Sequence, residues 1–293
     1  MAQVKAKKSY GQHFLADESI ARRIAGTVLD YPAGTPLGDL PVVEIGPGTG
    51  ALTRWLADSG RPLEVVELDP EAAAYMRKAY PDVRLREEDF LRLDIDTLFP
   101  GRKIALIGNY PYNISTQIFF RVLDNRDKVQ ACSGMLQREV AQRICAREGS
   151  KTYGILSVLL QLWYDCEYLF TVDETVFRPM PKVKSGVLRL VRNGRTSLPC
   201  SEQMLRTVVK TGFGHRRKTL RNSLGPLCAS LQATTLPLGL DTPALKPYLP
   251  KRPEQLAPQE FVRLACILQG TETPRCSAAH RPPTQHQSDA SPG

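Results

Sequence analysis

The chain has 293 residues and a formal net charge of +9, and 42% of its residues are hydrophobic and 24% are charged. This composition excludes a small disulfide-stapled scaffold, a fibrous repeat and a wholly disordered chain, and it predicts one large or two modest soluble domains. Residues 178–222 hold 12 basic residues and one acidic residue, a net of 12 − 1 = +11, so the other residues sum to 9 − 11 = −2. The positive charge is therefore local, which favours one surface that faces a polyanion.

The cysteines and the apolar runs indicate a compartment. The seven cysteines are an odd number, scattered and without a C-x-x-C pair, so reduced thiols and no bound metal are expected. No apolar stretch follows the N-terminal lysines, and the richest apolar run, 154–164, is too short and too polar to span a bilayer. We expect a cytoplasmic protein without a membrane anchor.

The N-terminal half alternates between helical and strand patterns. Residues 17–29 carry apolar side chains at helical spacing behind an aspartate that can cap a helix. Five short apolar runs follow, and helical stretches separate most of them. This alternation predicts βαβ crossovers, and therefore a parallel sheet covered by helices on both faces. The predicted strands are 41–45, 63–68, 83–87, 103–108 and 131–136, and the predicted helices between them are 49–60, 70–80 and 113–123.

The pattern changes after Tyr153. Three further stretches are expected to complete the sheet with a terminal antiparallel hairpin: 154–164, 166–172 and 183–191. Beyond residue 193 the apolar spacing turns helical, which predicts a small all-helical domain. Its predicted helices are 202–210, 215–224 and 258–269. From Thr271 onward Pro, Ser, His and Gln predominate, which is typical of a disordered tail. The predicted fold class is thus α/β, a Rossmann-like doubly wound sheet with a small C-terminal all-helical domain.

The first predicted strand runs directly into a glycine-rich turn, and a helix follows at once. The turn is Gly46-Pro47-Gly48-Thr49-Gly50. A strand, a glycine-rich turn and a helix start form a nucleotide-binding corner, because bare backbone N–H groups admit a ligand. The spacing G-x-G-x-G, in place of G-x-G-x-x-G, favours S-adenosylmethionine over a dinucleotide. On these residues alone, a tight turn that merely needs positive φ stays an alternative.

Carboxylates stand at the ends of the next two predicted strands. Glu67 ends the second strand, where it can accept both ribose hydroxyls of a cofactor. Asp89 follows the third strand and can accept a hydrogen bond from an adenine amine, with Glu87 and Glu88 as competing candidates. Ligands bind outside the carboxyl ends of parallel strands, so these groups are expected at one site.

The motif most specific to a reaction follows the fourth predicted strand. It is Asn109-Tyr110-Pro111-Tyr112, in the place where amino-methyltransferases keep an Asn/Asp-x-Pro-aromatic sequence. An exocyclic purine amine is a poor nucleophile, because its lone pair is delocalised into the ring. The Asn109 side-chain oxygen and the Tyr110 carbonyl can accept its two N–H groups and direct the lone pair toward a methyl donor. Tyr112 can stack on the base.

Together with Ser9-Tyr10-Gly11-Gln12-His13-Phe14-Leu15, these motifs resemble the KsgA family of small-subunit ribosomal RNA adenine dimethyltransferases. Further matching stretches are 113–116, 135–139, 177–183 and 213–222, and only the C-terminal tail lies clearly outside the resemblance. The resemblance implies transfer of methyl groups from S-adenosylmethionine, without a metal, to N6 of two adjacent adenosines in a hairpin loop near the 3′ end of 16S rRNA. The expected partner is the immature 30S subunit, and we expect a monomer.

The resemblance also implies a set of site residues. The cofactor is expected against Gln12, His13, Leu15, Gly46, Gly48, Glu67, Asp89 and Asn109, and the target base between Tyr112 and Phe177. Phe177 has a plain core position as its alternative. The chain departs from the family at three places: His13 replaces Asn, Tyr110 replaces Leu or Ile, and Met180 interrupts a run of prolines. Because the contribution of Tyr110 comes from its main chain, its side-chain change should be tolerated.

Basic residues predict the RNA contacts. Residues 215–221 are expected on one helix, where Arg217 and Arg221 share a face. RNA phosphates suit such a face, although a merely solvated face is the alternative. The candidates are Arg216, Arg217, Lys218, Arg221, Lys182 and Lys184. Lys5, Lys7 and Lys8 either extend this patch as an arm or form a solubilising tail.

The resulting division of the chain has four parts. They are an arm that covers the cofactor (1–16), a methyltransferase domain (17–192), a helical rRNA-binding domain (193–270) and a disordered tail (271–293). Three rival functions stay open: dimethylation of 23S rRNA of the macrolide-resistance type, DNA adenine methylation, and a non-catalytic assembly or transcription factor on the same fold. The intact catalytic motif favours an enzyme over the last of these.

Overall fold

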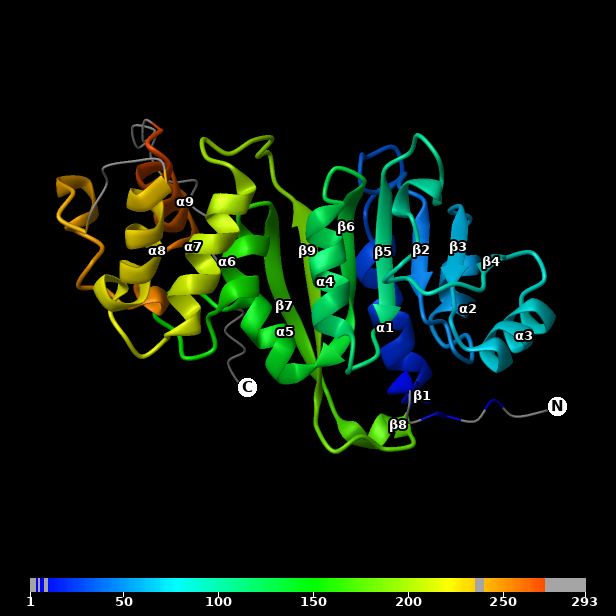
Figure 1. Ribbon diagram of the computed structural model, residues 1–293. Coiled ribbons are helices and arrows are strands. Elements are labelled where there is room, and N and C mark those ends of the chain that lie inside the picture. The colour runs from blue at the N-terminus through cyan, green and yellow to red at the C-terminus, as the bar shows by residue number, and fades with distance from the viewer. Residues whose placement is uncertain (1–3, 5, 8–9, 235–239, 272–293) are drawn as a thin grey trace, which may run out of the picture.

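The computed structural model describes residues 4, 6–7, 10–234 and 240–271. The predictions for Lys5, Lys8 and the tail beyond Thr271 lie outside these ranges. Figure 1 shows a central sheet with helices on both faces and a helical region at one end. The spatial order of its strands is β4 (Arg84–Arg86), β3 (Leu63–Val66), β2 (Val42–Ile45), β5 (Ile104–Asn109), β6 (Val129–Gln137), β9 (Ser185–Arg192) and β7 (Tyr164–Val172).

The strand pairing confirms the predicted doubly wound sheet. All five predicted strands are present, and β4, β3, β2, β5 and β6 pair in parallel. The expected antiparallel hairpin is also present, with β9 inserted between β6 and β7. One stretch differs, because residues 155–161 form a helix and no strand. This helix is buried on nearly all sides, and a fully buried helix has the same unbroken apolar pattern as a buried strand.

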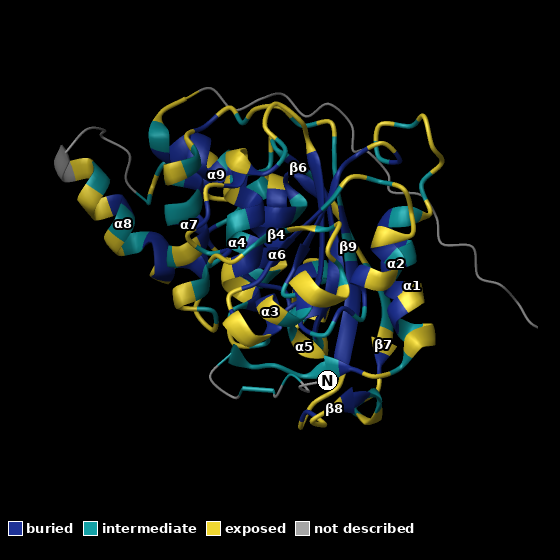
Figure 2. Ribbon diagram, turned by 90° about the vertical axis from the view of Figure 1, so that its right-hand side faces the viewer, coloured by how far each residue is buried: buried dark blue, intermediate teal, exposed yellow. Residues whose placement is uncertain are grey.

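Alternate strand residues face two separate cores. Val43 and Leu106 belong to the core beneath α4 (Ser115–Asp124), α5 (Arg138–Cys145) and α6 (Ile155–Gln161). Val42 and Ile107 belong to the core beneath α1 (Glu18–Leu29) and α2 (Thr53–Ala57). This is the period-two alternation of a sheet covered on both sides. Figure 2 shows the buried strands between helices whose outer faces are exposed. The remaining crossover helix is α3 (Pro70–Ala79), which follows β3.

A short antiparallel ribbon lies outside the main sheet. It pairs β1 (Phe14–Leu15) with β8 (Phe177–Arg178), so that Leu15 stands opposite Phe177. In Figure 1 the ribbon lies at the lower end of the molecule, the end toward which the arrow of β5 points. Strands of two residues have no periodicity to detect, so the sequence did not predict this ribbon.

The C-terminal helices form one group. They are α7 (Glu202–Gly214), α8 (Leu220–Thr234) and α9 (Pro258–Gln269), with short 3-10 turns at Pro243–Leu245 and Pro253–Gln255. In this group α7 and α9 pack on α6, and α8 packs on α7. Phe213 stacks on Phe261, with ring centroids 5.8 Å apart, and meets Tyr153 edge-on at 6.0 Å. One hydrophobic cluster extends from the strands to α9, so the division at residue 192 stays a sequence-based prediction. No helix of the described ranges is long and apolar enough to cross a membrane.

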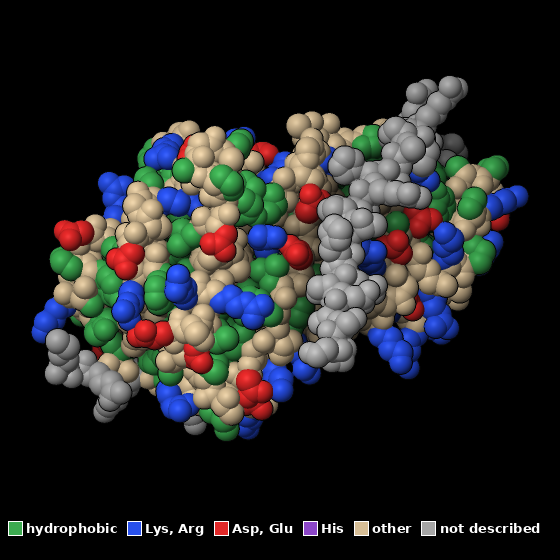
Figure 3. All heavy atoms as spheres, turned by 180° about the vertical axis from the view of Figure 1, so that it is seen from behind, with side chains coloured by type: hydrophobic (Ala, Val, Ile, Leu, Met, Phe, Trp, Pro, Cys, Tyr) green, Lys and Arg blue, Asp and Glu red, His purple; other side chains and the backbone are tan. Residues whose placement is uncertain are grey.

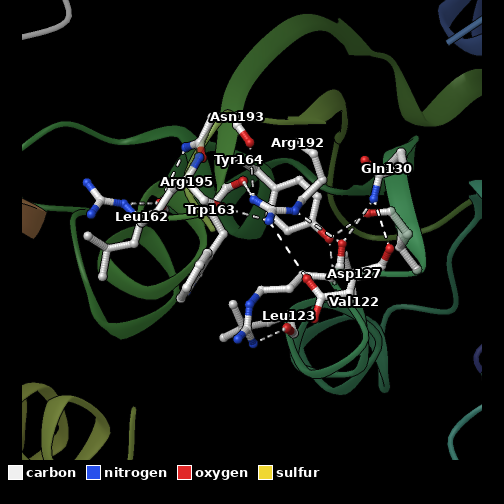
Figure 4. Close-up of polar contacts among 12 residues, drawn as sticks. Val122, Leu123, Asp127, Gln130, Leu162, Trp163, Tyr164, Arg192, Asn193 and Arg195 are labelled. Carbon is white, nitrogen blue, oxygen red and sulfur yellow. Dashed lines mark hydrogen bonds and ion pairs between the residues drawn. The ribbon is translucent and has the colours of Figure 1, made fainter. Parts of the chain in front are cut away.

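Arginine side chains bond the end of β9 to its neighbours (Figure 4). The guanidinium of Arg192 donates to the carbonyls of Trp163 at 2.6 Å, Arg195 at 2.9 Å and Arg126 at 3.1 Å. Arg195 in turn donates to the carbonyl of Leu162 at 3.0 Å. Since these donors satisfy backbone acceptors, two cations of the basic segment (residues 178–222) hold the chain together where it leaves the sheet.

Candidate active site

A cavity of about 340 Å³ lies beyond the carboxyl ends of β2, β3 and β5. Its wall comes from residues 10–15, the glycine-rich turn, the end of β3, residues 88–91 and residues 109–114. Eleven predicted site residues therefore meet at one place. They are Gln12, His13, Leu15, Gly46, Gly48, Glu67, Asp89, Asn109, Tyr110, Pro111 and Tyr112.

The cavity wall is acidic. Four acidic residues line it, and no lysine or arginine of the described chain does; they are Glu44, Glu67, Glu88 and Asp89. Burial raises the pKa of Glu44 to about 8, so Glu44 contributes little to this negative charge at neutral pH. A concave surface with one sign of charge attracts a ligand of the opposite sign. The cavity therefore favours a ligand that carries positive charge.

The glycine-rich turn leaves room for a ligand. Gly46 and Gly48 have φ of +65° and +55°, a conformation that L side chains rarely adopt. A Cβ atom at Gly46 would meet nothing within 4 Å, whereas one at Gly48 would lie 2.9 Å from the Phe14 ring. The turn thus needs glycine for its backbone, and at Gly46 it leaves open space in the cavity wall.

Glu67 is held by the backbone around it. Its Oε2 accepts from the Gly48 N–H at 3.1 Å, and its Oε1 accepts from the Asp69 N–H at 2.9 Å. Burial raises the pKa of Glu67, although these two hydrogen bonds oppose that rise. Each carboxylate oxygen retains a further lone pair, so Glu67 can accept two hydroxyl groups of a ligand.

Asp69 is a buried anchor that the sequence did not indicate. It accepts from Lys7 Nζ at 2.7 Å and Gln12 Nε2 at 3.1 Å, and it caps α3 through the Glu71 N–H at 3.1 Å. Although burial opposes the effect, the hydrogen bonds from Lys7 and Gln12 lower the pKa of Asp69. The Gln12 oxygen also accepts from the Lys7 N–H at 2.9 Å. Gln12 therefore fixes the N-terminal segment over the cavity, and Lys7 belongs to this anchor.

We expect the buried carboxyl group of Glu44 to make the free energy of unfolding depend on pH. It accepts a 2.6 Å hydrogen bond from the Thr53 hydroxyl, and burial raises its pKa from 4.5 to about 8. Between these values the folded chain holds a proton that the unfolded chain has lost, so this group's stabilising contribution declines as pH rises, by up to about 1.4 kcal/mol per pH unit. We expect Glu44→Gln to remove that decline. We expect the free energy of unfolding, measured with urea at pH 5, 6.5 and 8, to increase in the variant relative to the parent as pH rises. A difference in this free energy that stays constant with pH would contradict the raised pKa of Glu44.

Three acidic residues after β4 are candidates for the acceptor of the adenine amine, and they differ in whether they line the cavity. Asp89 lines the cavity, and its Oδ1 accepts from the Leu91 N–H at 2.9 Å, which fixes the carboxylate. Glu88 also lines the cavity. Glu87 instead pairs with Arg77 at 2.5 Å and is not among the lining residues. The candidate acceptors for the adenine amine are thereby reduced to Asp89 and Glu88.

The orientation of the Asn109 amide follows from its partner. Its Nδ2 donates to the His13 carbonyl at 2.8 Å. Because a carbonyl can only accept, the amide nitrogen must face His13, and the side-chain oxygen is left without this partner. The Tyr112 ring lies beside His13, with centroids 5.4 Å apart and an interplanar angle of 30°. Its hydroxyl oxygen is 2.6 Å from the Ser185 hydroxyl oxygen, which holds the ring at the cavity.

The structure explains how a tyrosine fits at position 110. Its ring is buried over two strand glycines, Gly108 and Gly134, where a Cβ atom would come within 3.0 and 2.8 Å of it. Its hydroxyl donates to the Ser133 carbonyl at 2.7 Å, and its N–H donates to the Met135 carbonyl at 2.8 Å. The side chain thus points into the core, and these two hydrogen bonds fix residues 109–112 to β6.

Phe177 does not reach the cavity. It is fully buried, with 0% exposure, and packs in the core beneath α1 with Leu15, Met135 and Val187. The β1–β8 pairing turns Phe177 and Leu15 toward this core, and Phe177 is not among the cavity residues. In this structure Phe177 therefore has the core position that the sequence left as its alternative. Its stacking on the target base stays a prediction.

The basic candidates form two groups, and the predicted basic helix is wrong. α7 ends at Gly214 and α8 begins at Leu220, so residues 215–219 are a turn. The Leu220 N–H donates to the Lys251 carbonyl at 2.8 Å, which turns the chain. On this turn and the first turn of α8, three lysine and arginine side chains are exposed: Arg217, Lys218 and Arg221. Arg216 instead lies 3.9 Å from Glu254 and donates to the Ser150 carbonyl at 3.2 Å.

The second group lies near the cavity. Lys182 is exposed, and Lys184 pairs with Asp173 at 2.9 Å. Other cations of the basic segment are also neutralised, since Arg189 pairs with Glu167 and Arg206 pairs with Asp124. The net charge of this segment therefore overstates the basic surface. On the face drawn in Figure 3, Lys and Arg are interspersed with Asp and Glu among the described side chains.

Known proteins match this chain over most of its length. "Ribosomal RNA small subunit methyltransferase A" of Porphyromonas gingivalis is 56% identical over 272 residues, which is 92% of this chain and 100% of that protein. The Bacteroides fragilis protein of the same name is 51% identical and covers 90% of this chain and 92% of its own.

Solved structures agree in fold. A dimethyladenosine transferase from Plasmodium falciparum has a TM-score of 0.73 at 22% identity, over 89% of this chain and 100% of that one. The 23S rRNA methyltransferase ErmE has a TM-score of 0.59 at 26% identity, over 87% of this chain and 99% of that one. The sequence model of ribosomal RNA adenine dimethylases matches residues 3–244. This chain belongs to the ribosomal RNA adenine dimethylase family.

Proposed function

We propose that this protein uses S-adenosylmethionine to dimethylate N6 of two adjacent adenosines in a hairpin loop near the 3′ end of 16S rRNA, on the immature small subunit in the cytoplasm. The small-subunit assignment is supported by relatives with that name at 51% and 56% identity, compared with 26% for the 23S enzyme. The observation that carries the chemistry is the Asn109 amide, whose nitrogen is bound to His13 so that its oxygen can serve the substrate.

The cavity fits S-adenosylmethionine. That molecule carries a sulfonium and an ammonium, which suit a wall that holds Glu67, Glu88 and Asp89 and has no lysine or arginine among its described residues. Glu67 would accept the ribose hydroxyls, and Asp89 or Glu88 the adenine amine. The open space at Gly46 admits a ligand close to the backbone. When bound there, the cofactor supplies an electrophilic methyl group.

The protein's own residues activate the amine. Asn109 Oδ1 and the Tyr110 carbonyl accept the two N–H groups of N6, which favours a tetrahedral nitrogen with its lone pair directed at the methyl donor. The Tyr112 ring provides one face for the extruded base. The two acceptor oxygens then hold the acidic N–H of the methylated nitrogen until its proton passes to water. A second round on the monomethylated amine needs only one of the two acceptors.

Exposed cations on the α7–α8 turn would bind RNA phosphates. Arg217 and Arg221 are exposed, and no hydrogen bond or ion pair joins their side chains to another described residue. We expect the double variant Arg217→Ala/Arg221→Ala to weaken rRNA binding at low salt and to reduce the slope of log affinity against log salt by about 2. The matched control is Lys78→Ala/Lys103→Ala, which removes two exposed cations elsewhere. Equal slopes for both double variants would contradict an RNA contact at the turn.

Mapping the product tests the proposed function. The protein is incubated with labelled S-adenosylmethionine and unmethylated small subunits, and the modified nucleotides are located. We expect N6,N6-dimethyladenosine at two adjacent positions near the 3′ end of 16S rRNA. Label in 23S rRNA or in DNA would favour the rival enzymes, and no label would favour a non-catalytic assembly factor.

A further inference from the structure

Two exposed apolar side chains lie on one short segment beside the cavity. Among the described residues only three large hydrophobic side chains are classed as exposed: Met180 at 60%, Leu68 at 46% and Val183 at 45%. Leu68 lines the cavity. Met180 and Val183 both belong to residues 179–184, which join β8 to β9. Scattered exposed apolar groups are ordinary, but this pair shares one segment next to a ligand cavity.

The segment 179–184 is fixed to the cavity near both of its ends. The Pro179 carbonyl accepts from His13 Nδ1 at 2.8 Å, and the nitrogen must carry the hydrogen because a carbonyl only accepts. The Ser185 hydroxyl, one residue past the other end, lies 2.6 Å from the Tyr112 hydroxyl. Pro181 is buried between them. The segment therefore lies next to the His13–Tyr112 ring pair, and its two apolar side chains point away from the protein interior.

The same surface carries uncompensated positive charge. Lys182 is exposed and has no ion pair with any described residue. The Arg178 guanidinium donates only to backbone carbonyls, those of Thr175 at 2.9 Å and Phe177 at 2.8 Å. Lys184 is neutralised by Asp173. An apolar surface beside free cations matches a nucleotide, which joins a large apolar ring face to a phosphate.

We propose that Met180 and Val183 form a shelf for the nucleobase that adjoins the adenosine in the cavity, and that Lys182 contacts the phosphate between the two. This proposal rests on the proposed function, in which the targets are adjacent. When one adenosine is extruded, its neighbour loses a stacking partner and exposes an apolar face to water. The shelf covers that face at the position where the neighbour must lie.

Kinetics with unmethylated small subunits test the shelf. We expect Met180→Ser/Val183→Ser to lower kcat/KM for the subunits at least tenfold, because losing one base contact typically costs that much. The dissociation constant for S-adenosylmethionine should stay within twofold. Met180→Leu keeps an apolar surface and should retain kcat/KM within twofold. Both positions are largely exposed, so thermal melting should show the parent's stability.

The positive charge of Lys182 is tested with a second variant and a matched control. Lys182→Ala should lower kcat/KM for subunits severalfold, and Lys103→Ala, an exposed lysine at the opposite end of β5, should not. Parental kcat/KM in the double serine variant, or a tenfold loss in Met180→Leu, would overturn the shelf. A parent protein that leaves the subunits unmethylated would instead overturn the proposed function, so the two failures are distinguishable.

Crosslinking decides what covers the shelf. The photoreactive residue p-benzoylphenylalanine is introduced at position 180, and the full-length protein is irradiated on unmethylated small subunits. We expect a covalent adduct with 16S rRNA at a nucleotide next to a methylated adenosine. An adduct with a ribosomal protein would overturn the proposal, because it would assign this surface to a protein partner.

Discussion

Asn109→Ala is expected to lower the rate of methyl transfer by about 10²–10³-fold and to leave rRNA affinity nearly unchanged. The variant loses the oxygen that accepts one N–H of the reacting amine, and removing one preorganised hydrogen-bond partner of a transition state typically costs that much. It also loses the 2.8 Å hydrogen bond to the His13 carbonyl. Single-turnover rates with saturating subunits and cofactor measure the effect, and a binding assay with rRNA shows that affinity is preserved.

The chain offers a matched control for this substitution. Asn125 follows α4 and, like Asn109, donates its amide to a backbone carbonyl, that of Arg121 at 2.8 Å. It lies outside the cavity wall. Asn125→Ala should cost about 1 kcal/mol of stability and leave the single-turnover rate unchanged. If both alanine variants methylate subunits at the parental rate, Asn109 has no catalytic role.

Glu67→Ala is expected to weaken binding of S-adenosylmethionine by at least 100-fold. A charge-assisted hydrogen bond contributes about 1.5–3 kcal/mol, and the variant loses two such bonds to the ribose. Glu67→Gln keeps one acceptor oxygen, so its dissociation constant for S-adenosylmethionine should lie between those of Glu67→Ala and the parent. Isothermal titration of the three proteins measures the dissociation constants.

An exposed carboxylate elsewhere on the protein provides the control for Glu67. Glu139→Ala removes a glutamate from the first turn of α5 that is not among the cavity residues. Its dissociation constant should equal that of the parent. A value for Glu67→Ala within threefold of the parent, in protein shown to be folded by its melting transition, would remove Glu67 from the cofactor site.

The sequence predicted most of the sheet, and the misses have physical causes. The strands at 104–109 and 129–137 were recognisable because short apolar runs alternated with helical stretches. The helix at 155–161 was missed because burial on nearly all sides erases helical periodicity. The helix expected over 215–224 starts only at Leu220, because the chain turns there toward the carbonyl of Lys251. Spacing alone does not encode such a tertiary contact.

The site was predictable where a motif follows a strand. The glycine-rich turn, Glu67, Asp89 and the Asn109 motif meet at one cavity because parallel strands end at a common edge. Phe177 lies in the core because a two-residue ribbon with Leu15 turns it inward, and ribbons this short leave no local pattern in the sequence. Asp69 and the exposed pair on residues 179–184 depend on long-range contacts with the N-terminal segment, which no local pattern reveals.

A structure of this protein bound to an unmethylated small subunit would show how the site holds the reacting amine. The measured quantity is the distance from N6 of the extruded adenosine to Asn109 Oδ1 and to the Tyr110 carbonyl oxygen. We expect both distances to be about 2.7–3.2 Å, with the base against Tyr112. An adenosine bound elsewhere, or an Asn109 oxygen turned away from N6, would contradict this expectation.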